Sequence, residues 1–169
     1  MEWAPALLTA ARGNKRDERK MAKKPIGRLD HIGVAVKNIA EARGFFEERL
    51  GATFLYEHEN PEAGYRLAEF DLGGTTIELL EPLGENSFIA AFLEKRGEGV
   101  HHLTFDAPDS RERIAELKRE GVKIVDEREF SADSYEAFIS PRSSHGVLIQ
   151  VGSGYPTLAR AAEWFKRKD

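Results

Sequence analysis

The sequence contains no cysteine. Disulfide bonds and thiolate metal ligands are therefore excluded, and any metal must be held by histidine, carboxylate, amide or water ligands. Long apolar runs are also lacking: none approaches the roughly 20 residues that a membrane-spanning helix requires. The apolar piece at residues 3–11 is too short and too interrupted for a secretory signal. We expect a soluble, cytoplasmic protein with no membrane partner.

The chain also lacks a strong excess of either charge. Its 25 lysine and arginine residues face 29 aspartate and glutamate residues, which gives a net charge of -4. No basic stripe of the kind that binds nucleic acid stands out, so we expect no nucleic-acid partner. Hydrophobic residues make up 41% of the 169, which is enough to bury a sizeable core within one domain.

Two strand-like runs of the chain resemble one another. Residues 29–36 read Leu-Asp-His-Ile-Gly-Val-Ala-Val, and residues 100–107 read Val-His-His-Leu-Thr-Phe-Asp-Ala. Each run alternates its side chains in the manner of a β-strand. Superposing them with an offset of 71 places His31 over His102. The match indicates an internal duplication.

The resemblance between the two halves continues beyond these runs. The same offset places Asn38 over Asp109, and each begins a helical pattern with an acidic residue three positions later, typical of a helix N-terminus. At an offset of 72, Thr-Ile-Glu-Leu at residues 76–79 lies over Leu-Ile-Gln-Val at residues 148–151. We therefore expect two modules of similar fold that share one core.

Each module predicts the element order βαβββ. The first has strands at 29–36, 52–58, 65–72 and 75–81 with a helix at 39–50; the second has strands at 100–107, 122–128, 135–140 and 147–151 with a helix at 110–120. Gly73-Gly74 predicts a tight hairpin. In the connector, Ser87 caps a helix at 88–96 that Gly97 ends. The fold class is α+β, with two tandem βαβββ modules forming a curved mixed sheet around a cleft.

The modules, about 29–82 and 100–152, together form one domain over residues 29–152. We expect the segment before them, residues 1–28, to be a disordered or loosely docked extension, because it combines a weakly apolar piece with a basic run and has no counterpart in the duplication. The segment after them, residues 153–169, carries an amphipathic helical pattern over 157–168.

The duplication places four ligand-competent side chains at symmetric positions. Because side chains alternate along a strand, His101 and His102 cannot both face the cleft, and symmetry with His31 selects His102. Glu78 and Gln150 occupy the same place in the last strand of each module. Taken alone, each of these residues is more often a structural residue than a metal ligand. As a set, they form a mixed nitrogen and oxygen site that suits Zn, Co, Ni or Mn.

Three segments carry a resemblance to a known family. They are residues 29–36, residues 77–84 (Ile-Glu-Leu-Leu-Glu-Pro-Leu-Gly) and residues 92–102 (Phe-Leu-Glu-Lys-Arg-Gly-Glu-Gly-Val-His-His). The chain resembles the vicinal oxygen chelate (glyoxalase/bleomycin resistance/dioxygenase) superfamily, and within it the methylmalonyl-CoA epimerases, over about residues 29–152. The resemblance implies a homodimer whose divalent metal chelates the thioester and carboxylate oxygens of an acyl-CoA, while carboxylates move the α-proton.

The carboxylates of that family are not all present here. Where the family has a glutamate that binds the metal and is proposed as a base, this chain has Gln150, which can ligate through oxygen but cannot accept the proton. We expect Glu78 to take over as base. A second family carboxylate on the third strand is replaced by Leu67, and Glu69, two residues along the same face, is the candidate substitute. Glu69 is equally interpreted as a solvated strand residue.

The resemblance also suggests substrate-binding residues. Pro-Arg-Ser at residues 141–143 is similar to the family's Pro-Lys-Ser turn, so Arg142 and Ser143 are candidates to bind a substrate carboxylate or phosphate. A surface arginine is the alternative interpretation of Arg142. With one carboxylate among its ligands, a divalent site keeps a net charge of +1 and favours an anionic bidentate substrate.

Three other functions fit the same residues. A glyoxalase I-type lyase would use the same metal and proton shuttle on a glutathione hemithioacetal. An iron-dependent oxygenase would use His31, His102 and Glu78 as two histidines and one carboxylate. A binding protein of the drug-sequestering type would keep the cleft and lack the chemistry.

Overall fold

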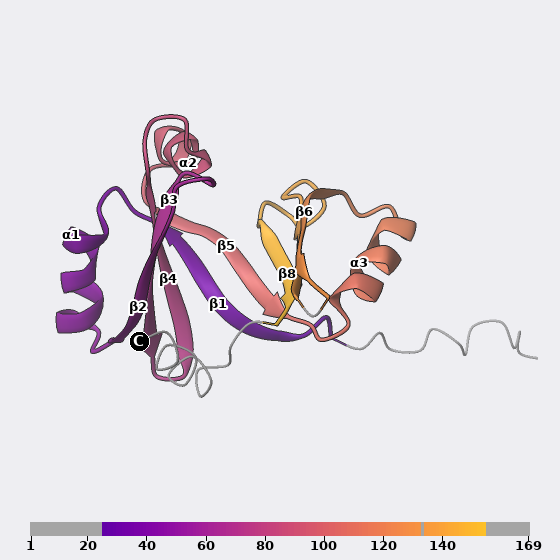
Figure 1. Ribbon diagram of the computed structural model, residues 1–169, viewed down its shortest axis with the longest axis horizontal. Coiled ribbons are helices and arrows are strands. Elements are labelled where there is room, and N and C mark those ends of the chain that lie inside the picture. Colours follow the sequence, from indigo (N-terminus) through magenta and orange to yellow (C-terminus); the bar gives the residue numbers. More distant parts are fainter. Residues whose placement is uncertain (1–24, 133, 155–169) are drawn as a thin grey trace, which may run out of the picture.

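The computed structural model describes residues 25–132 and 134–154 (Figure 1). Most of the expected N-terminal extension and the expected helix at 157–168 lie outside these residues. Arg28 opens the first strand, and Ile26 packs against the core of the second half. None of the helices within the described residues combines the length and hydrophobicity that a membrane span requires.

The order of elements follows the duplicated pattern. The elements are β1 (Arg28–Ala35), α1 (Ile39–Gly44), a π-helical turn η1 (Phe45–Arg49), β2 (Thr53–Asn60), β3 (Tyr65–Leu72), β4 (Thr75–Pro82), α2 (Phe88–Arg96), β5 (Gly99–Asp106), α3 (Ser110–Arg119), β6 (Ile124–Ser131), β7 (Ser134–Ile139) and β8 (Ile149–Ser153). The first expected helix is therefore α-helical in its first part and π-helical in its second.

The eight strands form one mixed sheet in the order β2-β3-β4-β1-β5-β8-β7-β6. In each half, the first strand runs parallel to the last: β1 pairs with β4, and β5 pairs with β8. The halves join where β1 and β5 pair antiparallel. Figure 1 shows the sheet curving between α1 and α3, which lie at opposite outer ends of the molecule. The predicted α+β architecture of two tandem βαβββ modules is confirmed.

Each half buries an apolar core beneath its own helix. In the first half, Phe70 and Leu79 from the sheet belong to the cluster that includes Ile39 of α1. In the second half, Ile114 of α3 packs with Val151 of β8. Full burial of side chains of this size contributes roughly 1.5–3 kcal/mol each. The helices therefore cover the outer faces of the sheet, and the polar side chains of the central strands are directed to the inner face.

The capping residues of the two equivalent helices differ. Asn38 accepts a hydrogen bond from the backbone nitrogen of Glu41 at 2.9 Å, as the N-cap pattern predicts. Asp109 stands at the equivalent position of α3, but its side chain makes no capping hydrogen bond, and its backbone (φ -103°, ψ 30°) lies outside the extended region. The sequence duplication therefore preserves the helix start without preserving its hydrogen bond.

Candidate active site

A cavity of about 440 Å³ lies between the two halves and is lined by strands of both. The first half contributes residues from β1 to β4, and the second half contributes residues from β5 to β8. Four of the sequence candidates, His31, Glu78, His102 and Gln150, line this cavity together. The duplication thus brings residues that are far apart in the chain to one place.

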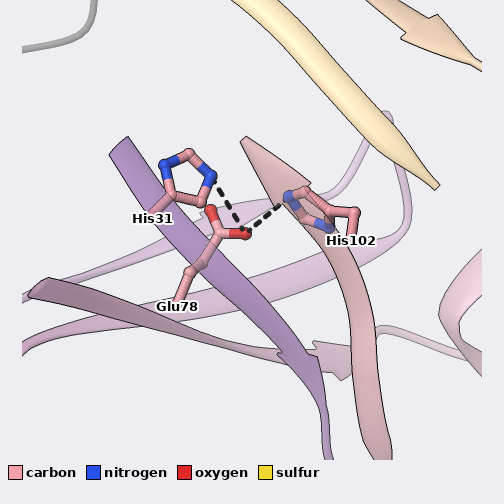
Figure 2. A group of neighbouring side chains, drawn as sticks. All are labelled: His31, Glu78 and His102. Atoms are coloured by element: carbon pink, nitrogen blue, oxygen red, sulfur yellow. Dashed lines mark ion pairs between the residues drawn. The ribbon is translucent and has the colours of Figure 1, made fainter. Parts of the chain in front are cut away.

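Three of these side chains form a compact cluster (Figure 2). The Oε2 atom of Glu78 lies 3.9 Å from Nε2 of His31 and 3.6 Å from Nε2 of His102. One ligand atom from each residue lies within 4.8 Å of the others. The residues stand on β4, β1 and β5 and are only 8%, 5% and 5% exposed. Two imidazoles and one carboxylate are a ligand set for a divalent transition metal.

The hydrogen bonding of the two histidines fits a metal site. Among the described residues, the buried Nε2 atom of His102 has no hydrogen-bond partner. Such an orphaned atom is costly unless something fills its place, and a cation beside Glu78 would do so. His31 is oriented from its other nitrogen, because Nδ1 lies 2.9 Å from Oδ1 of Asp30. A carboxylate behind a ligating histidine is the usual way of fixing its ring.

Gly33 on β1 explains how the ring of His102 reaches the cluster. A Cβ atom added at Gly33 would lie 2.2 Å from Cε1 and 2.4 Å from Nδ1 of His102. The imidazole therefore packs directly against the Cα atom of this glycine, in space that any side chain would fill. Glycine is therefore needed at position 33 for the ring of His102 to approach the backbone of β1 this closely.

The expectation that His101 turns away from the cleft is wrong, because a β-bulge breaks the alternation. Gly33 pairs with His102 and Val34 pairs with Val100, so His101 is an extra residue on β5. Both histidines line the cavity, with their Nδ1 atoms 3.0 Å apart. A bulge leaves one residue unpaired and re-aims its side chain. If His102 offers the lone pair of Nε2 to a metal, its Nδ1 is protonated and donates a hydrogen bond to Nδ1 of His101.

Gln150 makes two hydrogen bonds that fix its amide. Its Oε1 accepts from Oγ1 of Thr104 at 2.8 Å, and its Nε2 donates to Oε2 of Glu136 at 2.6 Å. An amide oxygen has two lone pairs and can also bind a cation. Sequence reasoning did not identify Glu136, which is 8% exposed and lines the cavity on β7.

Carboxylates gather in this cavity. Burial raises the pKa of Glu78 to about 7, and the charges of Glu69 and Glu136 add to the shift while His31 opposes it. Burial also raises the pKa of Glu69, whose Oε1 accepts a hydrogen bond from the hydroxyl of Tyr56 at 3.0 Å. Glu69 is partly buried on β3 and lines the cavity. Such shifts are typical of groups that exchange protons.

The two candidate substrate-binding residues lie elsewhere. Arg142 and Ser143 stand in the turn between β7 and β8, and the cavity lining does not include them. Ser143 is engaged in the fold, because its Oγ accepts a hydrogen bond from the backbone nitrogen of Lys123 at 3.0 Å. A contact between this turn and a substrate that extends beyond the cavity stays a prediction.

The sequence matches known proteins over the part that builds this cavity. The family model of the Glyoxalase/Bleomycin resistance protein/Dioxygenase superfamily matches residues 30–138. The chain belongs to this superfamily. Its fold also matches solved members of the superfamily.

The chain is similar to an uncharacterized protein and to two acyl-CoA epimerases. The uncharacterized protein YqjC of Bacillus subtilis is 39% identical, over 75% of this chain and 91% of that protein. The ethylmalonyl-CoA/methylmalonyl-CoA epimerase of Cereibacter sphaeroides is 32% identical, over 75% of this chain and 97% of that protein. The crystal structure of methylmalonyl-CoA epimerase from Mycobacterium tuberculosis has a TM-score of 0.71 and 34% identity, covering 83% of this chain and 97% of that one.

Proposed function

We propose that this protein is a metal-dependent epimerase that interconverts the stereoisomers of methylmalonyl-CoA. The observation that carries the proposal is the buried cluster of His31, Glu78 and His102 in a cavity that holds further carboxylates. The names of the similar epimerases support the substrate class. The reaction needs a cation near an oxygen and a carboxylate near a carbon-bound proton, and this cavity offers residues for both.

His31, His102 and Glu78 would hold the metal, with the amide oxygen of Gln150 as a fourth ligand. This mixed set suits Zn, Co, Ni or Mn. When bound, the cation supplies positive charge that stabilises an enolate oxygen and so makes the neighbouring α-proton more acidic. Asp30 keeps Nε2 of His31 directed at the cluster by holding Nδ1.

The carboxylates of the first half would move the proton at one face of the substrate. Glu78 takes the α-proton of the substrate: the C–H bond breaks, and its electron pair passes into the thioester carbonyl to give the enolate. Glu69 is the cross-strand partner of Glu78 and is the second carboxylate on that side. The hydroxyl of Tyr56 holds Glu69 in place.

The proposal also covers the domain organisation, the compartment and the oligomeric state of the protein. We propose that residues 29–152 act as one domain, that the protein works in the cytoplasm, and that it forms a homodimer. The strands β2 and β6 end the sheet at its two edges, and such edges are common sites of association. Size-exclusion chromatography with light scattering measures the mass, and a monomer at micromolar concentration would contradict the dimer.

The test is exchange of the α-proton of methylmalonyl-CoA in D2O, followed by NMR or mass spectrometry. We expect deuterium uptake by protein loaded with Co, Zn, Mn or Ni, and loss of uptake in Glu78→Gln by at least 100-fold. Glu127→Gln is the matched control, because Glu127 pairs with Lys118 and Tyr135 away from the cavity. Absence of exchange with every metal would contradict the epimerase.

One observation supports a second function. Two histidines and one carboxylate are also the ligand set of non-haem iron oxygenases, and His31, His102 and Glu78 provide it. Protein loaded with Fe(II) that consumes oxygen in the presence of an organic substrate, and that does not exchange the α-proton, would favour the oxygenase.

A further inference from the structure

Glu136 is a buried carboxylate of the cavity that comes from the second half of the molecule. It stands on β7, whereas Glu69 and Glu78 come from β3 and β4 of the first half. Both of its oxygens are held: Oε2 accepts from Nε2 of Gln150 at 2.6 Å, and Oε1 lies 3.6 Å from Nη1 of Arg128. Burial of a charged group is expensive unless it is paired in this way. The fold therefore keeps a carboxylate oriented inside the cavity.

The registers of the two halves show where Glu136 stands in the duplication. Glu78 on β4 pairs with Glu69 on β3, and its counterpart Gln150 on β8 pairs with Phe138 on β7. Two residues earlier on β3 is Leu67, and two residues earlier on β7 is Glu136. Glu136 thus occupies in the second half the place that Leu67 occupies in the first.

The two halves therefore contribute acidic groups in a crossed arrangement. In the last strands, the first half has the carboxylate Glu78 and the second has the amide Gln150. At the equivalent place of β3 and β7, the first half has the apolar Leu67 and the second has the carboxylate Glu136. Each half supplies a carboxylate to a cavity that lies between them.

Inversion of a carbon centre needs this kind of pair. The enolate is planar at the α-carbon, so the proton that leaves from one face must be replaced from the other. One carboxylate cannot easily reach both faces of a substrate that is held by its oxygens. Two carboxylates that already stand on opposite faces of the α-carbon avoid the free-energy cost of moving one carboxylate between the faces.

On the basis of the proposed function, we propose that Glu136 is the second catalytic carboxylate, which exchanges a proton with the face of the α-carbon opposite to Glu78. In one direction, Glu78 removes the α-proton and becomes protonated. The protonated carboxyl of Glu136 then gives its proton to the α-carbon, a new C–H bond forms from the enolate electrons, and the thioester carbonyl is restored. The opposite stereoisomer reacts with the two roles reversed.

The variant Glu136→Gln tests this assignment, because it keeps the shape of the side chain and removes its ability to carry the proton. With each stereoisomer separately in D2O, we expect inversion to fall by at least 100-fold. Exchange should persist for the one stereoisomer whose proton faces Glu78 and be lost for the other. The molar ratio of bound metal to protein, measured by elemental mass spectrometry, should equal that of the wild type. The matched control is Glu129→Gln on the outer face of β6, where Glu129 is exposed and pairs with Arg111.

The wild-type protein gives a second measurement that does not depend on the variant. With two carboxylates, the inverted product formed early in D2O carries solvent deuterium at the α-carbon, while recovered substrate keeps its protium. Inverted product that retains the original protium would show a single carboxylate serving both faces. That result, or undiminished inversion in Glu136→Gln, would overturn the assignment and leave the epimerase itself intact. A wild-type protein that neither exchanges nor inverts would instead contradict the proposed function.

Discussion

At the scale of single residues, Gly33 is the position where one added carbon should matter most. In Gly33→Ala the new Cβ would meet the imidazole of His102 at 2.2 Å, so the ring must leave the cluster with Glu78. We expect affinity for Co(II) to fall by about 10–100-fold, as for other changes that disorient a metal ligand. Calorimetric titration of metal-free protein with cobalt measures it.

The matched control is Gly44→Ala, because a Cβ there would meet only the flexible end of Glu48, at 3.9 Å. Gly44 is helical, so alanine at this position should stabilise the fold by roughly 0.5–1 kcal/mol and leave cobalt affinity unchanged. Equal cobalt affinity in Gly33→Ala and the wild type would mean that His102 does not hold the metal through the ring position described.

Sequence reasoning about single residues selected neighbouring side chains where symmetry decided the question. His31, Glu78, His102 and Gln150 were selected by the duplication, and all line one cavity. It failed for His101, because period-two alternation assumes an unbroken ladder and a bulge cannot be read from Val-His-His-Leu alone. Glu136 cannot be found by symmetry, because its counterpart in the first half is the apolar Leu67 and no shared residue type marks the position.

At the scale of elements, the two equivalent helix starts should differ in their contribution to stability. Asn38→Ala removes a hydrogen bond to the backbone nitrogen of Glu41 and should lower the free energy of unfolding by about 1 kcal/mol. Asp109→Ala removes no such bond and should change it by less than about 0.5 kcal/mol. Urea unfolding followed by circular dichroism compares them. Equal losses in the two variants would contradict the difference in capping.

Most elements could be predicted because their signals are local. Gly73 and Gly74 both adopt positive φ in the hairpin between β3 and β4, and Ser87 caps α2 through the backbone nitrogen of Ile89. The π-helical turn at Phe45–Arg49 could not be predicted, because its residues carry the same apolar spacing as an α-helix. The pairing of β1 with β5 also lies beyond a local pattern, since it joins strands from different halves.

At the scale of the whole molecule, the two halves are tied together by the candidate metal site as well as by the β1–β5 pairing. His31 and Glu78 come from the first half, and His102 comes from the second. A cation held by all three would bind the folded chain and not the unfolded one. Its binding energy therefore adds to the stability of the complete sheet, and not to that of one half.

This coupling predicts that metal stabilises the protein only while both halves supply their ligands. At a free cobalt concentration 100 times Kd, the folded state should gain about 2.7 kcal/mol, which raises Tm by about 5–11 °C for a chain of this size. His31→Ala and His102→Ala, one from each half, should each lose this gain. Thermal unfolding with cobalt and with a chelator measures it. If only one of the two variants lost the gain, the cation would be held by one half, and the cluster of Figure 2 would not be the binding site.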